Sequence, residues 1–140
     1  MSEIDKEKVK KQLQQEFLEL VAIDSPSWRE AEMAVEIRKK LEALGFQVIE
    51  DKVHNLYGYL PGQLDREPVL FSAHMDTVEP AKGKEAICEA DGTIRSAGKA
   101  VLGADCLSGL VEILQGIRLV QQSGQEHRPV EVLISVAEEI

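Results

Sequence analysis

The stretch PVLFSAHMD, residues 68–76, decides the fold, because an apolar run that opens at a proline ends directly in a histidine and an aspartate. A continuous apolar run of this kind is typical of a strand that is covered on both faces. The stretch VLISVAEE, residues 132–139, repeats the pattern and ends in two acids. In open α/β sheets, ligands bind beyond the carboxyl ends of the strands. The two stretches therefore predict a sheet whose carboxyl edge carries the functional groups.

Three amphipathic helices are predicted along the chain. Apolar residues recur at helical spacing over residues 9–21, 34–44 and 110–120. Ser27 and Glu30 match the pattern of a capping box in front of the second helix. Gly45 and Gly124 are expected to end the second and third helices, because glycine accepts the left-handed conformation that follows a helix.

Shorter strands complete the predicted sheet. FQVIED (residues 46–51) and NLYGYL (residues 55–60) alternate in the way that half-buried strands do. Asp91 and Gly92 lie between two short runs and predict a hairpin with a positive φ at the glycine. Because strands and helices alternate over most of the chain, the expected class is α/β, with a mostly parallel open sheet flanked by helices.

Composition narrows the functional classes. The chain has 140 residues, enough for one domain, and its net charge of -9 argues against nucleic acid and anionic membranes as partners. The N-terminus is charged and lacks the apolar core of a secretory signal, so a cytoplasmic location is expected. Cys88 and Cys106 are too few for a disulfide framework and are expected to be small core residues.

His74 and Asp76 stand two residues apart, so a continuing strand would point both side chains to the same side. The carboxylate would then reach the imidazole and fix its tautomer, as it does for many metal-bound histidines. The alternative is a polar pair that simply leaves the core for water at the end of a strand.

Three further acids are candidate metal-site residues. Asp105 follows a glycine and an alanine, which leave room for its carboxylate to bridge two metal ions. An ordinary helix N-cap is the alternative for this residue. Glu138 and Glu139 are adjacent, so one would bind metal while the other faces the attacking water as general base. A solvated strand end is the alternative for this pair.

Taken together and in order, SAHMDTVEP, VLGADCLSGL and SVAEEI resemble the co-catalytic zinc hydrolases of the peptidase T, acetylornithine deacetylase, succinyl-diaminopimelate desuccinylase and carboxypeptidase superfamily. The resemblance spans nearly the whole chain. It is closest to the peptidase T-like branch, whose members remove N-terminal residues from short peptides. The resemblance implies two divalent metal ions, zinc above all, and a small peptide substrate.

The resemblance also implies a role for each candidate residue. His74 would bind one zinc with Asp76 as its orienting partner, Asp105 would bridge both ions, Glu138 would be the general base and Glu139 a metal ligand. A cis peptide bond is implied after Asp105. Cys106 stands where relatives often carry aspartate, and it is assigned no ligand role, because a buried inert thiol is expected there.

Members of the superfamily are more than twice as long as this chain and complete the metal sites with a later acid and a later histidine. Residues 1–140 are therefore expected to be the N-terminal portion of a partial zinc-exopeptidase catalytic domain, with the remainder of that domain and the dimerisation or lid domain absent. His54 and His127 are expected at the surface rather than in the site. The full-length protein is expected to be a homodimer, and the 140-residue chain alone to have negligible peptidase activity.

Two other functions stay open on the sequence. An N-acyl amino acid deacylase would use the same metals and the same motifs. A catalytically dead α/β module that binds a partner would not need the metals at all.

Overall fold

Four strands form the main sheet, in the order β1-β2-β6-β3. The structure is a computed structural model that describes residues 4–140. The strands are β1 (Gln47–Glu50), β2 (Leu56–Leu60), β3 (Val69–His74) and β6 (Val130–Ser135). Only β3 and β6 pair in parallel, whereas β1 with β2 and β2 with β6 are antiparallel. The α/β class is confirmed, but the sheet is mixed rather than mostly parallel.

The mixed sheet follows from the lengths of the connections. A short turn joins β1 to β2, and such a turn gives an antiparallel pair. A parallel pair needs a long crossover, and α3 (Ala104–Ser123) provides one between β3 and β6. The parallel pair is the one that matters for the site, because its carboxyl ends meet at one edge.

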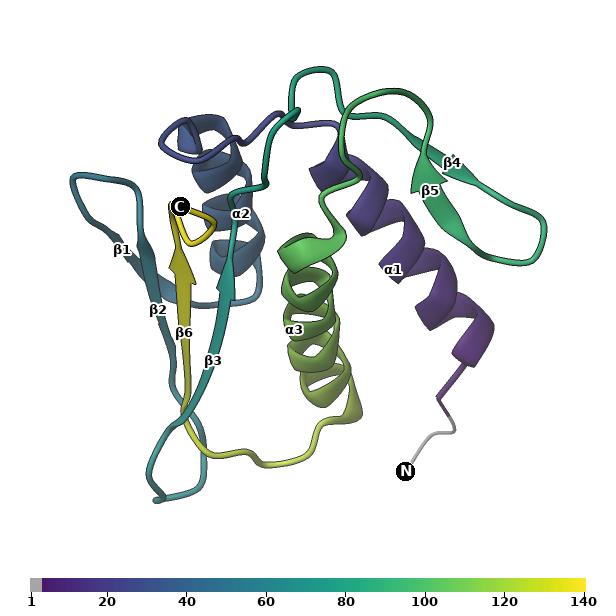
Figure 1. Cartoon of the computed structure of the whole chain (residues 1–140). Coiled ribbons are helices and arrows are strands. Elements are labelled where there is room, and N and C mark those ends of the chain that lie inside the picture. The colour runs from purple at the N-terminus through teal and green to yellow at the C-terminus, as the bar shows by residue number, and fades with distance from the viewer. Residues whose placement is uncertain (1–3) are drawn as a thin grey trace.

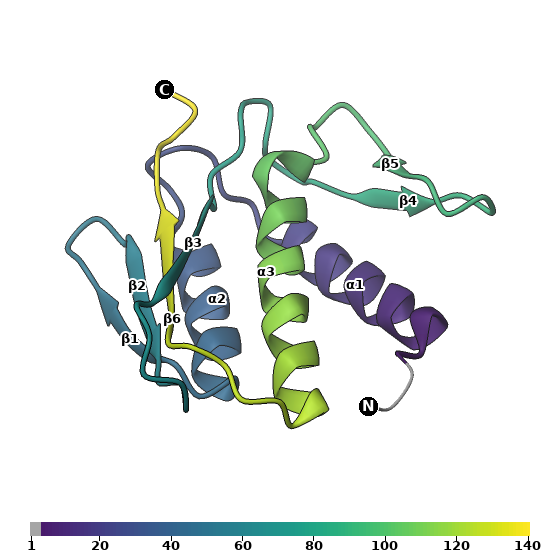
Figure 2. The same ribbon diagram turned by 90° about the horizontal axis from the view of Figure 1, so that it is seen from below.

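The helices lie on one side of the sheet (Figures 1 and 2). α2 (Ala31–Ala43) and α3 pack against the strands, and α1 (Lys6–Val21) packs against α3. The core between these layers is apolar, and its largest fully buried side chains include Leu20, Met33, Ile37, Leu41, Leu56, Leu107, Leu110, Leu114 and Ile134. Each such side chain contributes roughly 1.5–3 kcal/mol by leaving water. This core fixes the sheet edge and the start of α3 relative to each other.

β3 is less covered than its apolar sequence predicts. Leu70 is 57% exposed, and Phe71 and Ser72 are exposed too. Within residues 4–140, β3 is an edge strand of the sheet, and the helices pack on one face of the sheet only. The prediction of a strand buried on both faces is therefore wrong for the first part of β3, and only its end, from Ala73 onward, is buried.

The start of α2 also differs from the prediction. Glu30 is the N-cap residue, and no side chain caps the helix. Ser27 donates its hydroxyl hydrogen to Asp76 instead of bonding within the helix. The capping box is therefore not formed, because its two members bind partners far away in the sequence. The predicted ends are confirmed, with positive φ values of 92° at Gly45 and 68° at Gly124.

A separate hairpin lies at the edge of the molecule, above α1 in the view of Figure 1. β4 (Ala86–Cys88) pairs with β5 (Ile94–Ser96), and Gly92 between them has a φ of 91°. The predicted hairpin is confirmed. Cys88 is exposed on this hairpin, so the expectation that it is a core residue is wrong. Among residues 4–140, no helix combines the length and apolarity that a membrane span requires.

Candidate metal centre

The three sequence motifs meet at one edge of the sheet. β3 and β6 run parallel, with His74 opposite Ser135, so both strands end at the same place (Figure 2). Residues 136–139 continue directly from β6 at this edge. The first turn of α3 carries Asp105 and lies at the same edge. The contact between the Asp105 carboxylate and His74 shows this position.

His74 is the common member of the site. It is 8% exposed, and its Nε2 lies 2.9 Å from Oδ1 of Asp105 and 3.7 Å from Oε2 of Glu138. Its Nδ1 lies 3.0 Å from the backbone oxygen of Asp76. Both ring nitrogens thus face acceptor oxygens, and only the doubly protonated imidazolium can donate to both at once.

The electrostatics agree with this geometry. Burial by itself lowers the pKa of His74, because it disfavours the charged ring. The hydrogen bond to Asp105 and the contacts with Asp76 and Glu138 outweigh burial, so the pKa of His74 is raised above its ordinary value. A cation is therefore favoured at Nε2, and that cation can be a proton or a metal ion.

Asp76 joins two of the motifs. Its carboxylate is fully buried and accepts the Ser27 hydroxyl at 2.7 Å and the backbone N–H groups of Glu138 at 3.0 Å and Glu139 at 3.1 Å. Burial by itself raises the pKa of Asp76. These hydrogen bonds and the His74 ring have the larger, opposite effect, so the pKa of Asp76 lies below its usual value. Its Oδ1 also lies 3.3 Å from Nδ1 of His74. The predicted contact between the His74 ring and the Asp76 carboxylate exists. The shorter distance from Nδ1, however, is to the backbone carbonyl oxygen of Asp76.

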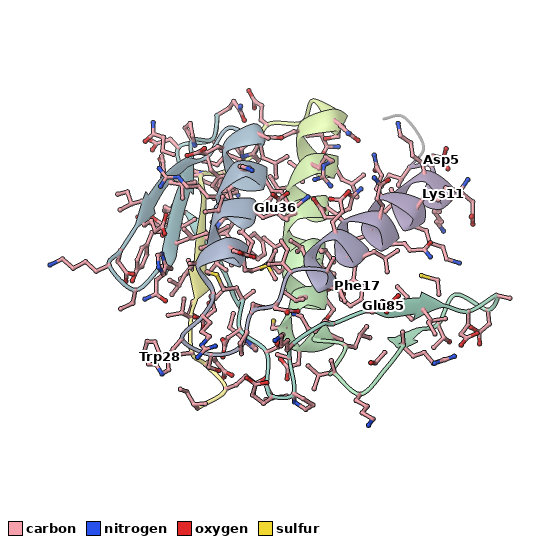
Figure 3. All side chains as sticks on the ribbon, turned by 90° about the horizontal axis from the view of Figure 1, so that it is seen from above. Asp5, Lys11, Phe17, Trp28, Glu36 and Glu85 are labelled. Carbon is pink, nitrogen blue, oxygen red and sulfur yellow. The ribbon has the colours of Figure 1, made fainter. Side chains whose placement is uncertain are left out.

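The turn that carries Glu138 and Glu139 is also held by side chains, which bind the two residues just before the acid pair. The Asn55 side chain accepts the N–H of Val136, and Glu30 accepts the N–H of Ala137, each at 2.9 Å. Ala137 adopts a left-handed φ of 51°. Glu30 also accepts the N–H of Trp28, whose side chain stands on the outside of the molecule (Figure 3).

Glu30 and Asn55 were missed by sequence reasoning. Glu30 was assigned to a capping box, and nothing in the residues around Asn55 indicates a partner 81 residues away.

Asp105 is not the N-cap of α3, because Gly103 holds that position. Asp105 and Cys106 have non-helical backbone angles, and the peptide bond between them is cis, as the resemblance implies. The Asp105 side chain is 85% exposed and points its Oδ1 at His74. It is therefore open to a ligand on the solvent side.

Two sets of possible ligands share His74. One set adds Asp105 and Cys106, and the other adds Glu138 and Glu139. In each set the ligand atoms lie within 4.8 Å of one another. The three acids predicted around His74 (Asp105, Glu138 and Glu139) thus lie near it, with Asp76 behind them, and Cys106 lies near it as well.

The other two histidines have separate partners. His54 pairs with Glu50 at 2.6 Å, and the half-buried His127 bonds the backbone oxygen of Arg128 at 2.8 Å. Neither belongs to the two ligand sets found among residues 4–140.

Comparison with known proteins finds similar chains. The Bacillus subtilis (strain 168) protein YqjE, itself uncharacterized, is 35% identical over an alignment of 137 residues that covers 92% of this chain and 37% of YqjE. Aminopeptidase PepT of Bacillus cereus ATCC 10987 is 36% identical, with a TM-score of 0.88 over 93% of this chain and 37% of its own. A tripeptidase of Staphylococcus aureus subsp. aureus Mu50 is 32% identical, with the same TM-score and shares. No protein-family profile matches the chain.

The chain thus spans 37% of the length of these three proteins. The similarity covers 92–93% of this chain.

Proposed function

By sequence and fold the chain belongs to the metallopeptidase superfamily of peptidase T, and from this premise we propose that it forms part of an enzyme that hydrolyses peptide bonds in small peptides. The observation that carries the proposal is the convergence of His74, Asp105, Glu138 and Glu139 at one sheet edge. These residues come from three elements that are far apart in the sequence.

The donor set fits divalent metal ions. One imidazole and three carboxylates are the ligand types that catalytic zinc sites use. The Nδ1 of His74 is already bonded to the Asp76 carbonyl, which leaves Nε2 as the nitrogen that faces the acids. In this proposal His74, Asp105 and Glu139 would hold the metal ions, and Asp105 would be the ligand common to both. Two divalent ions bound here would polarise the carbonyl group of the peptide and lower the pKa of the attacking water.

Glu138 is the general base in this proposal. Its side chain is exposed, and its Oε2 lies 3.7 Å from Nε2 of His74, at the edge of the ligand group. The carboxylate takes a proton from the attacking water and passes it to the leaving amine. Asp76 supports this role, because it holds the backbone N–H of Glu138 and limits where the side chain can lie.

Residues 1–140 supply the N-terminal portion of the catalytic domain in this proposal. The relatives are much longer than this chain, and we propose that the complete protein adds further metal ligands and forms a homodimer. The 140-residue chain alone is then expected to bind metal weakly and to have negligible peptidase activity.

Zinc binding tests the centre directly. We expect calorimetric titration to show Zn²⁺ binding by the 140-residue chain, and His74→Ala and Glu139→Ala to weaken it by about tenfold or more. His127→Ala, which changes a histidine outside the centre, should leave the affinity unchanged. A chain that neither binds Zn²⁺ nor is stabilised by it would be a catalytically dead binding module.

Substrate class is tested on the full-length protein. Hydrolysis of tripeptides in preference to N-acetyl and N-succinyl amino acids supports the peptidase. The reverse preference would assign the protein to the N-acyl amino acid deacylases, which use the same motifs.

A further inference from the structure

Cys106 lies at the metal centre and also packs against the edge of the apolar core. It is a free cysteine and only partly buried. Its Sγ, a ring nitrogen of His74 and a carboxylate oxygen of Asp105 all lie within 4.8 Å of one another. The thiol is therefore partly buried, as a core residue would be, but its sulfur also lies close to two candidate metal ligands.

The local backbone explains this position. Cys106 has φ -116° and ψ 27°, which are not helical, so the backbone at this residue departs from the regular helix of α3. A Cβ atom added at Gly109 would lie only 3.0 Å from the Cys106 Sγ. Glycine at position 109 thus leaves the space that the sulfur atom occupies between the first turn of α3 and the sheet edge.

The spacing suits a single metal ion after a small movement. Zn–S and Zn–N bonds are about 2.3 Å and 2.0–2.1 Å long, so tetrahedral coordination puts the two donors about 3.6 Å apart. Drawing the three ligand atoms together from within 4.8 Å requires a contraction of roughly 1 Å. Asp105 is exposed on the solvent side, and its side chain is free to make that movement.

Resting on the proposed function, we propose that Cys106 is a metal ligand and gives this centre a preference for thiophilic divalent ions. On binding, the Cys106 thiol releases its proton to solvent, and the sulfur donates an electron pair to the ion. Thiolates favour Zn²⁺ and its softer relative Cd²⁺, whereas Mn²⁺ and Mg²⁺ favour oxygen donors. The centre is therefore a His–Asp–Cys site, with selectivity that an aspartate at position 106 would not give.

Cadmium titration of the 140-residue chain tests this assignment, because a Cd–thiolate bond has its own ultraviolet charge-transfer absorption. The wild-type chain should gain this absorption band on adding Cd²⁺, and Cys106→Ser should lack it and bind Cd²⁺ about tenfold or more weakly. Mn²⁺ affinity should be the same in both proteins, because Mn²⁺ makes little use of sulfur. Cys88→Ser is the matched control, since Cys88 is a free cysteine that is exposed on the hairpin.

Each outcome decides a different point. Cd²⁺ binding by the wild-type chain without the band, or loss of the band in Cys88→Ser, would overturn the role of Cys106 and leave the proposed metal centre intact. Failure of the wild-type chain to bind any of Cd²⁺, Zn²⁺ and Mn²⁺ would overturn the metal centre and, with it, this role. Equal loss of Cd²⁺ and Mn²⁺ affinity in Cys106→Ser would also count against a sulfur ligand.

Discussion

Asp76 shows how one residue can build a site without being a metal ligand. Its carboxylate is buried and accepts hydrogen bonds from Ser27, Glu138 and Glu139, while its carbonyl accepts from His74. The histidine motif and the acid pair therefore share a single anchor. A buried carboxylate is costly unless it is well bonded, and here three donors compensate for its burial.

Asp76→Asn is expected to lower the free energy of unfolding by about 2–3 kcal/mol at pH 7, because hydrogen bonds to a charged acceptor are lost. The pKa of Asp76 is lowered in the folded state, so its contribution is present above the unfolded pKa and is lost as pH falls through the folded value. The difference between the two proteins should shrink below about pH 4. Urea unfolding of both proteins at several pH values measures it.

Ser27→Ala is the milder comparison, because it removes only one of the hydrogen bonds to Asp76. Its cost should be about 1 kcal/mol. A loss as large as that of Asp76→Asn would mean that the two backbone bonds contribute little.

Lys84 is a second buried charge close to the site. It is 5% exposed, and its Nζ lies 3.3 Å from Oγ of Ser25. Burial lowers the pKa of Lys84 to about 8, against the opposing attraction of Asp24. The folded protein therefore holds this proton less firmly than the unfolded chain does.

The stability contribution of Lys84 should rise with pH. Below about pH 8 the buried charge lowers the free energy of unfolding by its full amount. This cost falls as the pH rises and is gone above about pH 10.4, the pKa of lysine in the unfolded chain. The free energy of unfolding of the wild-type chain, minus that of Lys84→Met, should increase by at most about 3 kcal/mol between these pH values. Urea unfolding at pH 7.5 and 10.5 gives the difference, in which the other titrating groups cancel.

The exposed Lys82 provides the control. Lys82→Met removes an exposed lysine only two residues away, so the same subtraction shows what the loss of a lysine outside the core does. A flat result for Lys84→Met would show that its ammonium group is not destabilised by burial.

At the scale of the elements, the start of α2 supports the end of β6. Glu30, 2% exposed, accepts the N–H of Ala137 and holds the turn that presents Glu138 and Glu139. Glu30→Ala is expected to speed hydrogen exchange of the amides of residues 137–139 and to weaken Zn²⁺ binding by about tenfold. Glu30→Gln should restore most of both, because its amide oxygen can still accept.

Glu16 offers a matched control for Glu30. It is also a buried carboxylate, but it pairs with Arg118 and Lys40 between the helices, away from the site. Glu16→Ala should lower the free energy of unfolding without changing Zn²⁺ affinity. If the two alanine variants affect Zn²⁺ binding equally, Glu30 acts through general stability and not through the turn.

Local patterns predicted the elements well. The apolar stripes of α1 and α3 and the glycines after α2 and α3 follow from helix geometry, which repeats within a few residues. The hairpin at Gly92 is local in the same sense. The strand order, the mixed pairing and the one-sided cover of the sheet could not be predicted, because they depend on contacts between distant segments.

In the site, too, local patterns could be predicted from the sequence and contacts between distant segments could not. His74, Asp76 and the acid pair stand out because polar groups directly follow apolar strands. Glu30 and Asn55 do not, because their partners are backbone groups 107 and 81 residues away. Cys106 was assigned to the core, since its distance to His74 depends on how α3 meets the sheet.

At the scale of the whole molecule, the edge of the main sheet at β3 carries exposed apolar side chains. β3 pairs with β6 on one side only within residues 4–140, and Leu70 and Phe71 on it are exposed. A strand edge that has no neighbouring strand and carries apolar side chains is a template for pairing with another chain. The net charge of -9 opposes association, and salt weakens that opposition.

We therefore expect the 140-residue chain to self-associate through β3, more strongly at high salt. Analytical ultracentrifugation should show a sedimentation coefficient that rises with protein concentration. Leu70→Lys should suppress the rise, because a charge on an edge strand opposes strand pairing. Val35→Lys replaces an equally exposed aliphatic residue on α2 and should leave the association unchanged. A concentration-independent monomer, or equal suppression by both lysines, would show that β3 is not the contact surface.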